Sequence, residues 1–178
     1  MKFNVAQLLK AQVGTARQYD IDEEIDRIDD LTPVSHLTGK VKLTRIPAGV
    51  LVEADLHLTL ALACSRCLEE LTYPLHLNFS EEFEPTIDVV TGTELPEPED
   101  ANTFTIDANH ILDLTEAVRE YVLLALPMQP LCSEACAGLC PKCGQNLNRG
   151  KCDCPTSPAD SRLSVLAQLL EDQETDKE

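Results

Sequence analysis

The sequence is poor in positive charge and has no long apolar run. Its 178 residues include 14 Lys and Arg against 31 Asp and Glu, a formal net charge of −17. Such a surface repels a phosphate backbone and attracts a basic partner, although acidic residues also serve solubility alone. Because no stretch of eighteen apolar residues occurs, we expect no membrane span.

Signal-peptide and catalytic signatures are also missing. The first residues, MKFNVAQLLKAQVG, lack a long apolar core and a small-residue cleavage site, so we expect a cytoplasmic protein whose thiols stay reduced. No H-E-x-x-H, G-x-S-x-G, P-loop or G-x-G-x-x-G motif occurs. His57 and His76 face each other across a predicted hairpin, where a solvated pair is the default. We therefore assign no catalytic residue and predict no small-molecule substrate, and a carboxylate enzyme ranks low.

Alternating apolar and polar residues predict a half-buried antiparallel sheet. The strand segments are 39–46, 50–62, 71–79 and 104–106. Pairing Leu62 with Leu71 and Leu56 with Leu77 gives a hairpin whose tip is ACSRCLEE. The charged segment 19–30 is expected to be extended and edge-like, because repelling charges suit an edge strand.

Helices, an acidic loop and a cysteine-rich module complete the expected organisation. Apolar stripes and capping residues predict helices at 3–13, at 113–126 with Asp113 and Glu116 as a capping pair, and at 157–172. Residues 81–101 hold eight acids, three prolines and no base, which predicts a flexible loop. We expect an α+β core over 1–130, a metal-binding module over 131–155 and a terminal helix over 156–178 that packs on the core. The predicted fold is an antiparallel sheet or partly open barrel with flanking helices and a zinc knuckle.

The chain has eight cysteines in four close pairs, and six of them lie in CSEACAGLCPKCGQNLNRGKCDC, residues 132–154. Two neighbouring pairs make C-x2-C-x8-C-x-C, the spacing of an all-thiolate zinc site that has no open position and is therefore structural. Its predicted ligands are Cys140, Cys143, Cys152 and Cys154. The bases Lys142, Arg149 and Lys151 lie where they offset the negative charge of such a site.

The other two cysteine pairs leave several alternatives open. Cys132 and Cys136 can replace one pair of that quartet, or join Cys64 and Cys67 in a second site if the hairpin tip folds over the cluster. Disulfides, an iron–sulfur cluster and unliganded thiols also remain open. Cys64-Ser-Arg-Cys67 alone has the spacing of a redox pair, but its place at a hairpin tip favours a structural or metal role.

Several segments resemble one known family in order and spacing: NVAQLL, ACSRCLEEL, LTEAVREYVLLALPMQPLC and CAGLCPKCGQNLNRGKCDC. The resemblance, over nearly the whole chain, is to the YceD-like family of large ribosomal RNA subunit accumulation proteins. C-S-R-C matches that family's central signature, whereas only some members have the C-terminal cysteines.

The resemblance implies a non-enzymatic factor in large ribosomal subunit biogenesis, which supports accumulation or processing of the subunit's RNA. The expected partner is a ribosomal RNA precursor, contacted through Lys142, Arg149 and Lys151, or a basic large-subunit ribosomal protein bound by the acidic surface. The alternative is an RNA-processing nuclease or a thiol redox enzyme.

Overall fold

The computed structural model describes residues 1–154 except 26, 97, 99 and 101. Its helices are α1 (Ala6–Leu9) and α2 (Thr115–Ala125). Its strands are β1 (Lys2–Asn4), β2 (Ala16–Glu23), β3 (Thr32–Pro33), β4 (Leu37–Arg45), β5 (Val50–Ala63), β6 (Glu70–Pro85), β7 (Phe104–Ile106) and β8 (Ile111–Asp113). Neither helix has the length and apolarity needed to cross a bilayer. The predicted terminal helix lies outside the described residues.

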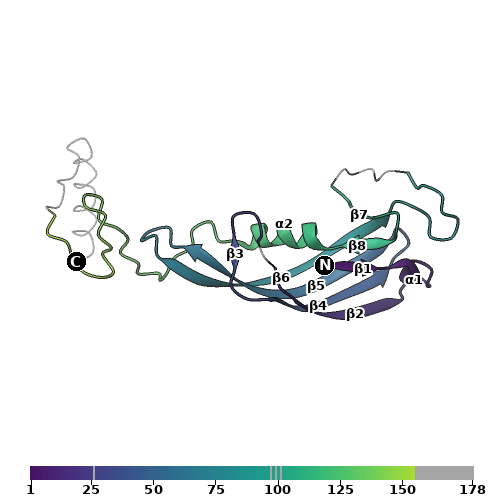
Figure 1. Cartoon of the computed structure of the whole chain (residues 1–178), viewed down its shortest axis with the longest axis horizontal. Coiled ribbons are helices and arrows are strands. Elements are labelled where there is room, and N and C mark those ends of the chain that lie inside the picture. Colours follow the sequence, from purple (N-terminus) through teal and green to yellow (C-terminus); the bar gives the residue numbers. More distant parts are fainter. Residues whose placement is uncertain (26, 97, 99, 101, 155–178) are drawn as a thin grey trace, which may run out of the picture.

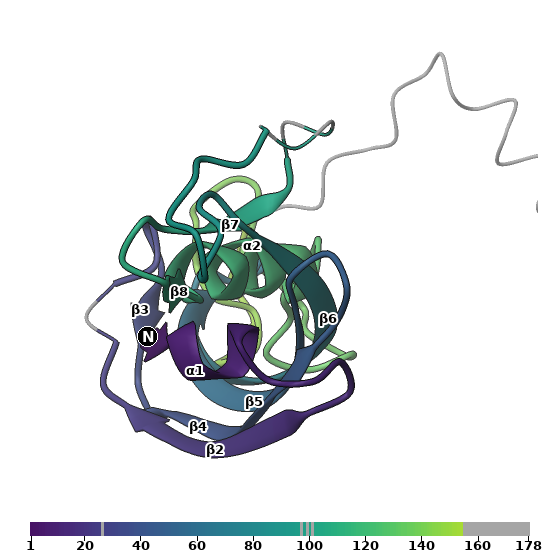
Figure 2. The same ribbon diagram turned by 90° about the vertical axis from the view of Figure 1, so that its right-hand side faces the viewer.

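The strands form one curved sheet in the order β1-β8-β7-β6-β5-β4-β2, and β3 pairs with β5. All neighbours are antiparallel except β6 and β7, which are parallel, so the predicted antiparallel sheet is in fact mixed. Viewed end-on, the sheet curls into a half-barrel with both helices on its concave side (Figure 2). The partly open barrel was therefore the better of the two predicted architectures.

The long hairpin of β5 and β6 has the predicted register. Leu56 pairs with Leu77 and Leu62 with Leu71, and the tip lies between Ala63 and Glu70. Apolar residues of one parity are buried, since residues two apart in a strand share a face. Figure 1 shows the hairpin reaching toward the cysteine-rich segment at one end of the molecule.

The predicted helix at 3–13 is much shorter in the structure. Its first residues form β1, where Phe3 pairs with Leu112 of β8 and its ring lies 4.9 Å from the ring of Tyr19. Only Ala6–Leu9 is helical, and the side chain of Asn4 accepts a hydrogen bond from the N–H of Ala6 at 3.2 Å. Sheet pairing and aromatic packing therefore override the helical spacing of the first residues.

Two charged segments differ in part from their predictions. The edge-like segment 19–30 corresponds to β2, which is an edge strand but runs from Ala16 and ends at Glu23. The predicted acidic loop begins too early, because residues 81–85 continue β6. Beyond them, Ile87 bridges to Glu94, and Asp88 accepts hydrogen bonds from the turn between them.

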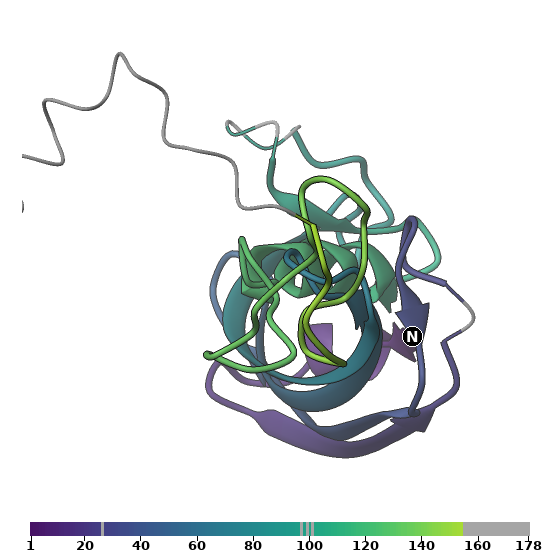
Figure 3. The same cartoon turned by 90° about the vertical axis from the view of Figure 1, so that its left-hand side faces the viewer.

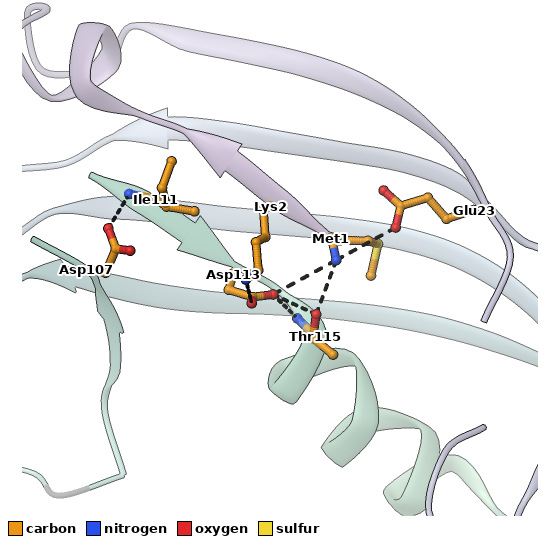
Figure 4. Close-up of polar contacts among 7 residues, drawn as sticks. All are labelled: Met1, Lys2, Glu23, Asp107, Ile111, Asp113 and Thr115. Atoms are coloured by element: carbon orange, nitrogen blue, oxygen red, sulfur yellow. Dashed lines mark hydrogen bonds and ion pairs between the residues drawn. The ribbon is translucent and has the colours of Figure 1, made fainter. Parts of the chain in front are cut away.

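The helix predicted at 113–126 is α2, and its start differs from the expected capping pair. Leu114 occupies the N-cap, while the Asp113 carboxylate accepts hydrogen bonds from the N–H (3.0 Å) and hydroxyl (2.6 Å) of Thr115. Glu116 instead pairs with Arg119 at 2.6 Å. The amino group of Met1 lies in the same cluster, 3.1 Å from the Thr115 hydroxyl (Figure 4). These contacts join β1, β8 and the start of α2.

Candidate metal centres and acidic groove

The eight cysteines meet in two groups of four at one end of the molecule. Within each group, all four Sγ atoms lie within 4.8 Å of one another. The bridging quartet consists of Cys64, Cys67, Cys132 and Cys136. The distal quartet consists of Cys140, Cys143, Cys152 and Cys154, the ligand set predicted from spacing. Figure 3 shows the loops of residues 131–154 at the end of the half-barrel.

The bridging quartet joins the β5–β6 hairpin tip to the loop that follows α2. The Sγ atoms of Cys64 and Cys136 are 3.8 Å apart, and those of Cys67 and Cys132 are 3.6 Å apart. Cys64, Cys67 and Cys136 are buried, and Leu71, Leu131 and Leu139 pack around them as a small core. The quartet is thus buried except at Cys132, which is exposed, and it combines residues far apart in sequence.

Each quartet contains a C-x-x-C turn with the same hydrogen bonds. The N–H of Arg66 donates to Cys64 Sγ at 3.5 Å, and the N–H of Lys142 donates to Cys140 Sγ at 3.4 Å. In both turns the N–H of the residue after the second cysteine also donates to the carbonyl of the first cysteine, at 3.0 and 2.9 Å. Such turns point backbone N–H groups at sulfur, which stabilises thiolates.

These donors give the thiols unequal acidity. Backbone N–H groups of Cys67 and Cys132 lower the pKa of Cys64 to about 6. In the distal quartet, the backbone N–H groups of Cys143 and Lys142 lower the pKa of Cys140 to about 6. Neighbouring sulfurs raise the pKa of Cys132 to about 12. One thiolate disfavours a second beside it, so all four sulfurs of a group can be thiolates together only with a cation among them.

Basic side chains also hold the hairpin tip against the cysteine-rich loops. Arg66 Nη1 donates to the carbonyl of Cys136 at 3.0 Å, and Arg149 Nε donates to Glu69 Oε1 at 2.8 Å. Arg149 is one of the predicted RNA contacts, and its exposed side chain also forms an ion pair with Glu69. Arg66 was not singled out from the sequence, although its place within C-S-R-C was a signal. The side chains of Lys142 and Lys151 form no ion pair within the described residues.

His57 and His76 are cross-strand partners, as predicted, and their rings stack 4.5 Å apart. Asp55 Oδ1 lies 3.0 Å from His76 Nε2 and 3.4 Å from His57 Nε2. All three side chains are more than half exposed. This group lies on the solvent-facing side of β5 and β6, where water reaches every member.

An acidic groove lies where β6, α2, residue 100 and residues 102–104 meet. Its volume is about 490 Å³, and five of its lining residues are acidic: Glu81, Glu82, Glu84, Asp100 and Glu120. None of the described residues that line this groove is basic. The arrangement favours a cationic ligand over an anionic one.

Comparison of the sequence with known protein families identifies one that it matches. Residues 52–170, which include all eight cysteines, match the family model described as "Large ribosomal RNA subunit accumulation protein YceD". The chain belongs to the YceD family. No solved structure matches it.

Proteins similar to this chain come from a plant and from bacteria. The Arabidopsis thaliana protein "Large ribosomal RNA subunit accumulation protein YCED homolog 1, chloroplastic" is 27% identical over 172 residues, 85% of this chain and 53% of the plant protein. This chain thus spans about half the length of that relative. Bacillus subtilis YlbN is 25% identical over 178 residues, with 96% of both chains covered. Rv2926c of Mycobacterium tuberculosis is 28% identical over 104 residues, 58% of this chain and 48% of that protein.

Proposed function

We propose that this YceD family member is a non-enzymatic cytoplasmic factor that supports accumulation or processing of large-subunit ribosomal RNA. The observation that carries the proposal is the family match over residues 52–170. The name of the Arabidopsis relative supports the same role. The charge is unevenly distributed along the chain and the cysteines are clustered. Both features suit a protein that binds a partner.

The proposed partner is a basic large-subunit ribosomal protein bound by the acidic groove. Residues 131–155 carry two acids and three bases, a formal charge of +1, and the rest of the chain carries −18. Four thiolates on a divalent ion add about two negative charges per quartet, so even the cysteine-rich end becomes less favourable for phosphate. Charge complementarity therefore favours a basic protein over the RNA precursor.

The distal quartet is proposed to bind a structural zinc ion. Four thiolate ligands prefer a soft metal in tetrahedral geometry and leave no position for water or substrate. Cys140 is buried, and Cys152 and Cys154 are half-buried. The ion would hold residues 140–154 in shape without taking part in a reaction.

The enzymatic alternatives receive less support from the same geometry. A thiol oxidoreductase needs a cysteine that its substrate can reach. Cys64 has 0% and Cys67 has 4% of its surface exposed. A metal-dependent nuclease needs ligands held in a fixed geometry, whereas the side chains of Asp55, His57 and His76 are each more than half exposed on an open sheet face.

A binding experiment tests the proposed partner. The chain is titrated against individual large-subunit ribosomal proteins and precursor RNA at several salt concentrations. The variant Glu82→Gln/Glu84→Gln/Glu120→Gln removes three groove charges, and Asp20→Asn/Glu24→Gln/Asp30→Asn removes as many exposed charges elsewhere. We expect a basic protein to bind the unmodified chain and the control, and the groove variant to bind at least about tenfold more weakly.

RNA binding gives a different result in the same titration. Lys142→Ala/Lys151→Ala would then weaken binding to precursor RNA, and affinity would fall with salt according to the phosphates contacted. That outcome would show that the partner is RNA and not a basic protein. Depletion of the protein in cells tests the role itself: the ratio of large-subunit to small-subunit ribosomal RNA should fall, and an unchanged ratio would overturn the proposed function.

A further inference from the structure

The bridging quartet has the size of a tetrahedral metal site. Zinc–sulfur bonds of about 2.3 Å place the sulfurs of a regular tetrahedron about 3.8 Å apart. The two Sγ–Sγ distances, 3.8 Å and 3.6 Å, fit two opposite edges of that tetrahedron. Both are well beyond the roughly 2.05 Å of a disulfide bond.

Hydrogen-bond donors surround the bridging sulfurs as they would surround bound thiolates. Cys64 Sγ accepts from the N–H of Arg66 and from the N–H of Cys132 at 3.4 Å. Cys136 Sγ accepts from the side-chain amide of Asn148 at 3.2 Å. Burial makes unbalanced thiolates costly, and a cation among these sulfurs would balance the charge that the donors favour.

The ligand set selects the metal and its role. Thiolates prefer soft or borderline ions, and four of them satisfy zinc completely. Four thiolate ligands leave no open coordination position for a substrate, so the ion would be structural. Its ligands come from two segments that are far apart in the sequence, since Cys64 and Cys136 are 72 residues apart.

We propose that Cys64, Cys67, Cys132 and Cys136 bind a second zinc ion that fastens the cysteine-rich loops to the tip of the β5–β6 hairpin. Neighbouring contacts at the same junction agree with this role. The Arg66 guanidinium donates a hydrogen bond to the carbonyl of Cys136, and the N–H of Ser65 donates to the carbonyl of Pro130 at 2.8 Å. A Cβ on Gly138 would lie 3.3 Å from the carbonyl oxygen of Arg66, so the two segments are closely apposed.

Metal stoichiometry of the full chain tests the proposal. Purified protein should contain two zinc ions per chain by elemental analysis. Cys67→Ser/Cys132→Ser and Cys143→Ser/Cys152→Ser should each contain one, and the combined variant none. Far-UV circular dichroism checks that the sheet persists. One zinc in the native chain, still present in Cys67→Ser/Cys132→Ser, would overturn the second site.

A ligand-preserving variant separates lost coordination from lost folding. Cys132 is the exposed member of the quartet, and imidazole is itself a good zinc ligand. Cys132→His should keep two zinc ions, whereas Cys132→Ser should bind the second ion at least about tenfold more weakly. Equal zinc affinity in the two variants would show that Cys132 is not a ligand.

The native protein provides a test that needs no variant. X-ray absorption at the zinc edge should show an average of four sulfur neighbours at about 2.3 Å. Alkylation without reductant, followed by mass spectrometry, should find no Cys64–Cys136 or Cys67–Cys132 crosslink. If the protein contains one zinc ion and these crosslinks are found, the four cysteines form two disulfide bonds and not a metal site.

Discussion

Leu68 has the same left-handed backbone as Gly144, at the equivalent position of the other C-x-x-C turn. Their φ angles are 60° and 74°. Each donates its N–H to the carbonyl of the first cysteine of its turn. Glycine adopts this conformation freely, whereas a side chain makes it costly by about 1–2 kcal/mol. The turn at the hairpin tip therefore has this geometry although Leu68 is unfavourable at a positive φ.

The first prediction is that Leu68→Gly stabilises the protein. Relief of the backbone strain outweighs the greater chain entropy of glycine, and Leu68 is 68% exposed, so little packing is lost. We expect the free energy of unfolding to rise by about 0.5–1 kcal/mol. Urea denaturation at a fixed free zinc concentration measures the change.

Leu68→Ala is the matched control for this prediction. Alanine removes most of the side chain but keeps the Cβ that disfavours a positive φ. Its free energy of unfolding should stay within about 0.5 kcal/mol of the unmodified protein. Equal stabilisation by alanine and glycine would show that the exposed Leu side chain, rather than backbone strain, is unfavourable.

The second prediction concerns metal release. The bridging quartet has three buried ligands and one exposed ligand, Cys132, whereas the distal quartet has only one buried ligand, and Cys143 is exposed. A chelator reaches the distal ion directly but must wait for the hairpin tip and loops to separate before it reaches the bridging ion. A colorimetric chelator should therefore remove zinc in two phases, with the second at least about tenfold slower.

Variants assign the two phases. Cys143→Ser/Cys152→Ser should lose the fast phase and keep the slow one, and Cys67→Ser/Cys132→Ser should do the opposite. A single phase that accounts for two zinc ions would contradict the difference in accessibility.

The sequence was most informative where the pattern was local. Alternation in β5 and β6 determined the buried face, and a shift of one residue would have turned every side chain to the other side. The distal quartet spans only residues 140–154, so its spacing alone indicated a shared site. When cysteines are this close in sequence, only a few arrangements of the loop bring their sulfurs together.

Features that depend on distant pairing were less predictable. The bridging quartet remained one alternative among several, because it forms only when a hairpin of the observed length brings its tip beside Pro130. The parallel pairing of β7 involves three residues, too few for a pattern. The helical spacing of the first residues was misleading because Phe3 pairs with Leu112 across the sheet.

The third prediction concerns pH and Asp113. Partial burial raises the pKa of this carboxyl, but hydrogen bonds from Thr115 and the charges of the amino terminus and Lys2 hold its pKa below the usual value. A group with a lowered pKa in the folded state stabilises the protein above its unfolded pKa, near 3.9. That contribution is lost as the pH falls through the folded pKa.

Asp113→Asn should therefore destabilise the protein by about 1 kcal/mol at pH 7. The difference from the unmodified protein should shrink as the pH falls below about 4. Thermal or urea denaturation over this pH range measures it. Asp20→Asn, on the exposed edge strand, is the control and should change the stability by less than about 0.5 kcal/mol. A penalty of the same size at every pH would mean that geometry, and not the carboxylate charge, is responsible.

The fourth prediction is that zinc removal unfolds one end of the molecule and leaves the half-barrel intact. The sheet and α2 share a large apolar core that contains none of the eight cysteines, whereas Cys64, Cys67 and Cys136 form a separate small one. Metal binding supplies most of the stability of such a small core. Its loss should therefore stay local.

Hydrogen exchange followed by mass spectrometry checks this on the full chain, with and without chelator. Peptides covering residues 64–69 and 131–154 should lose protection in chelator, while those from β4 and the middle of β5 should keep it. Cys143→Ser/Cys152→Ser serves as an internal comparison, because it should expose residues 140–154 and leave the hairpin tip protected. Loss of protection throughout the sheet would contradict two separate cores and make the bridging ion part of the main folding unit.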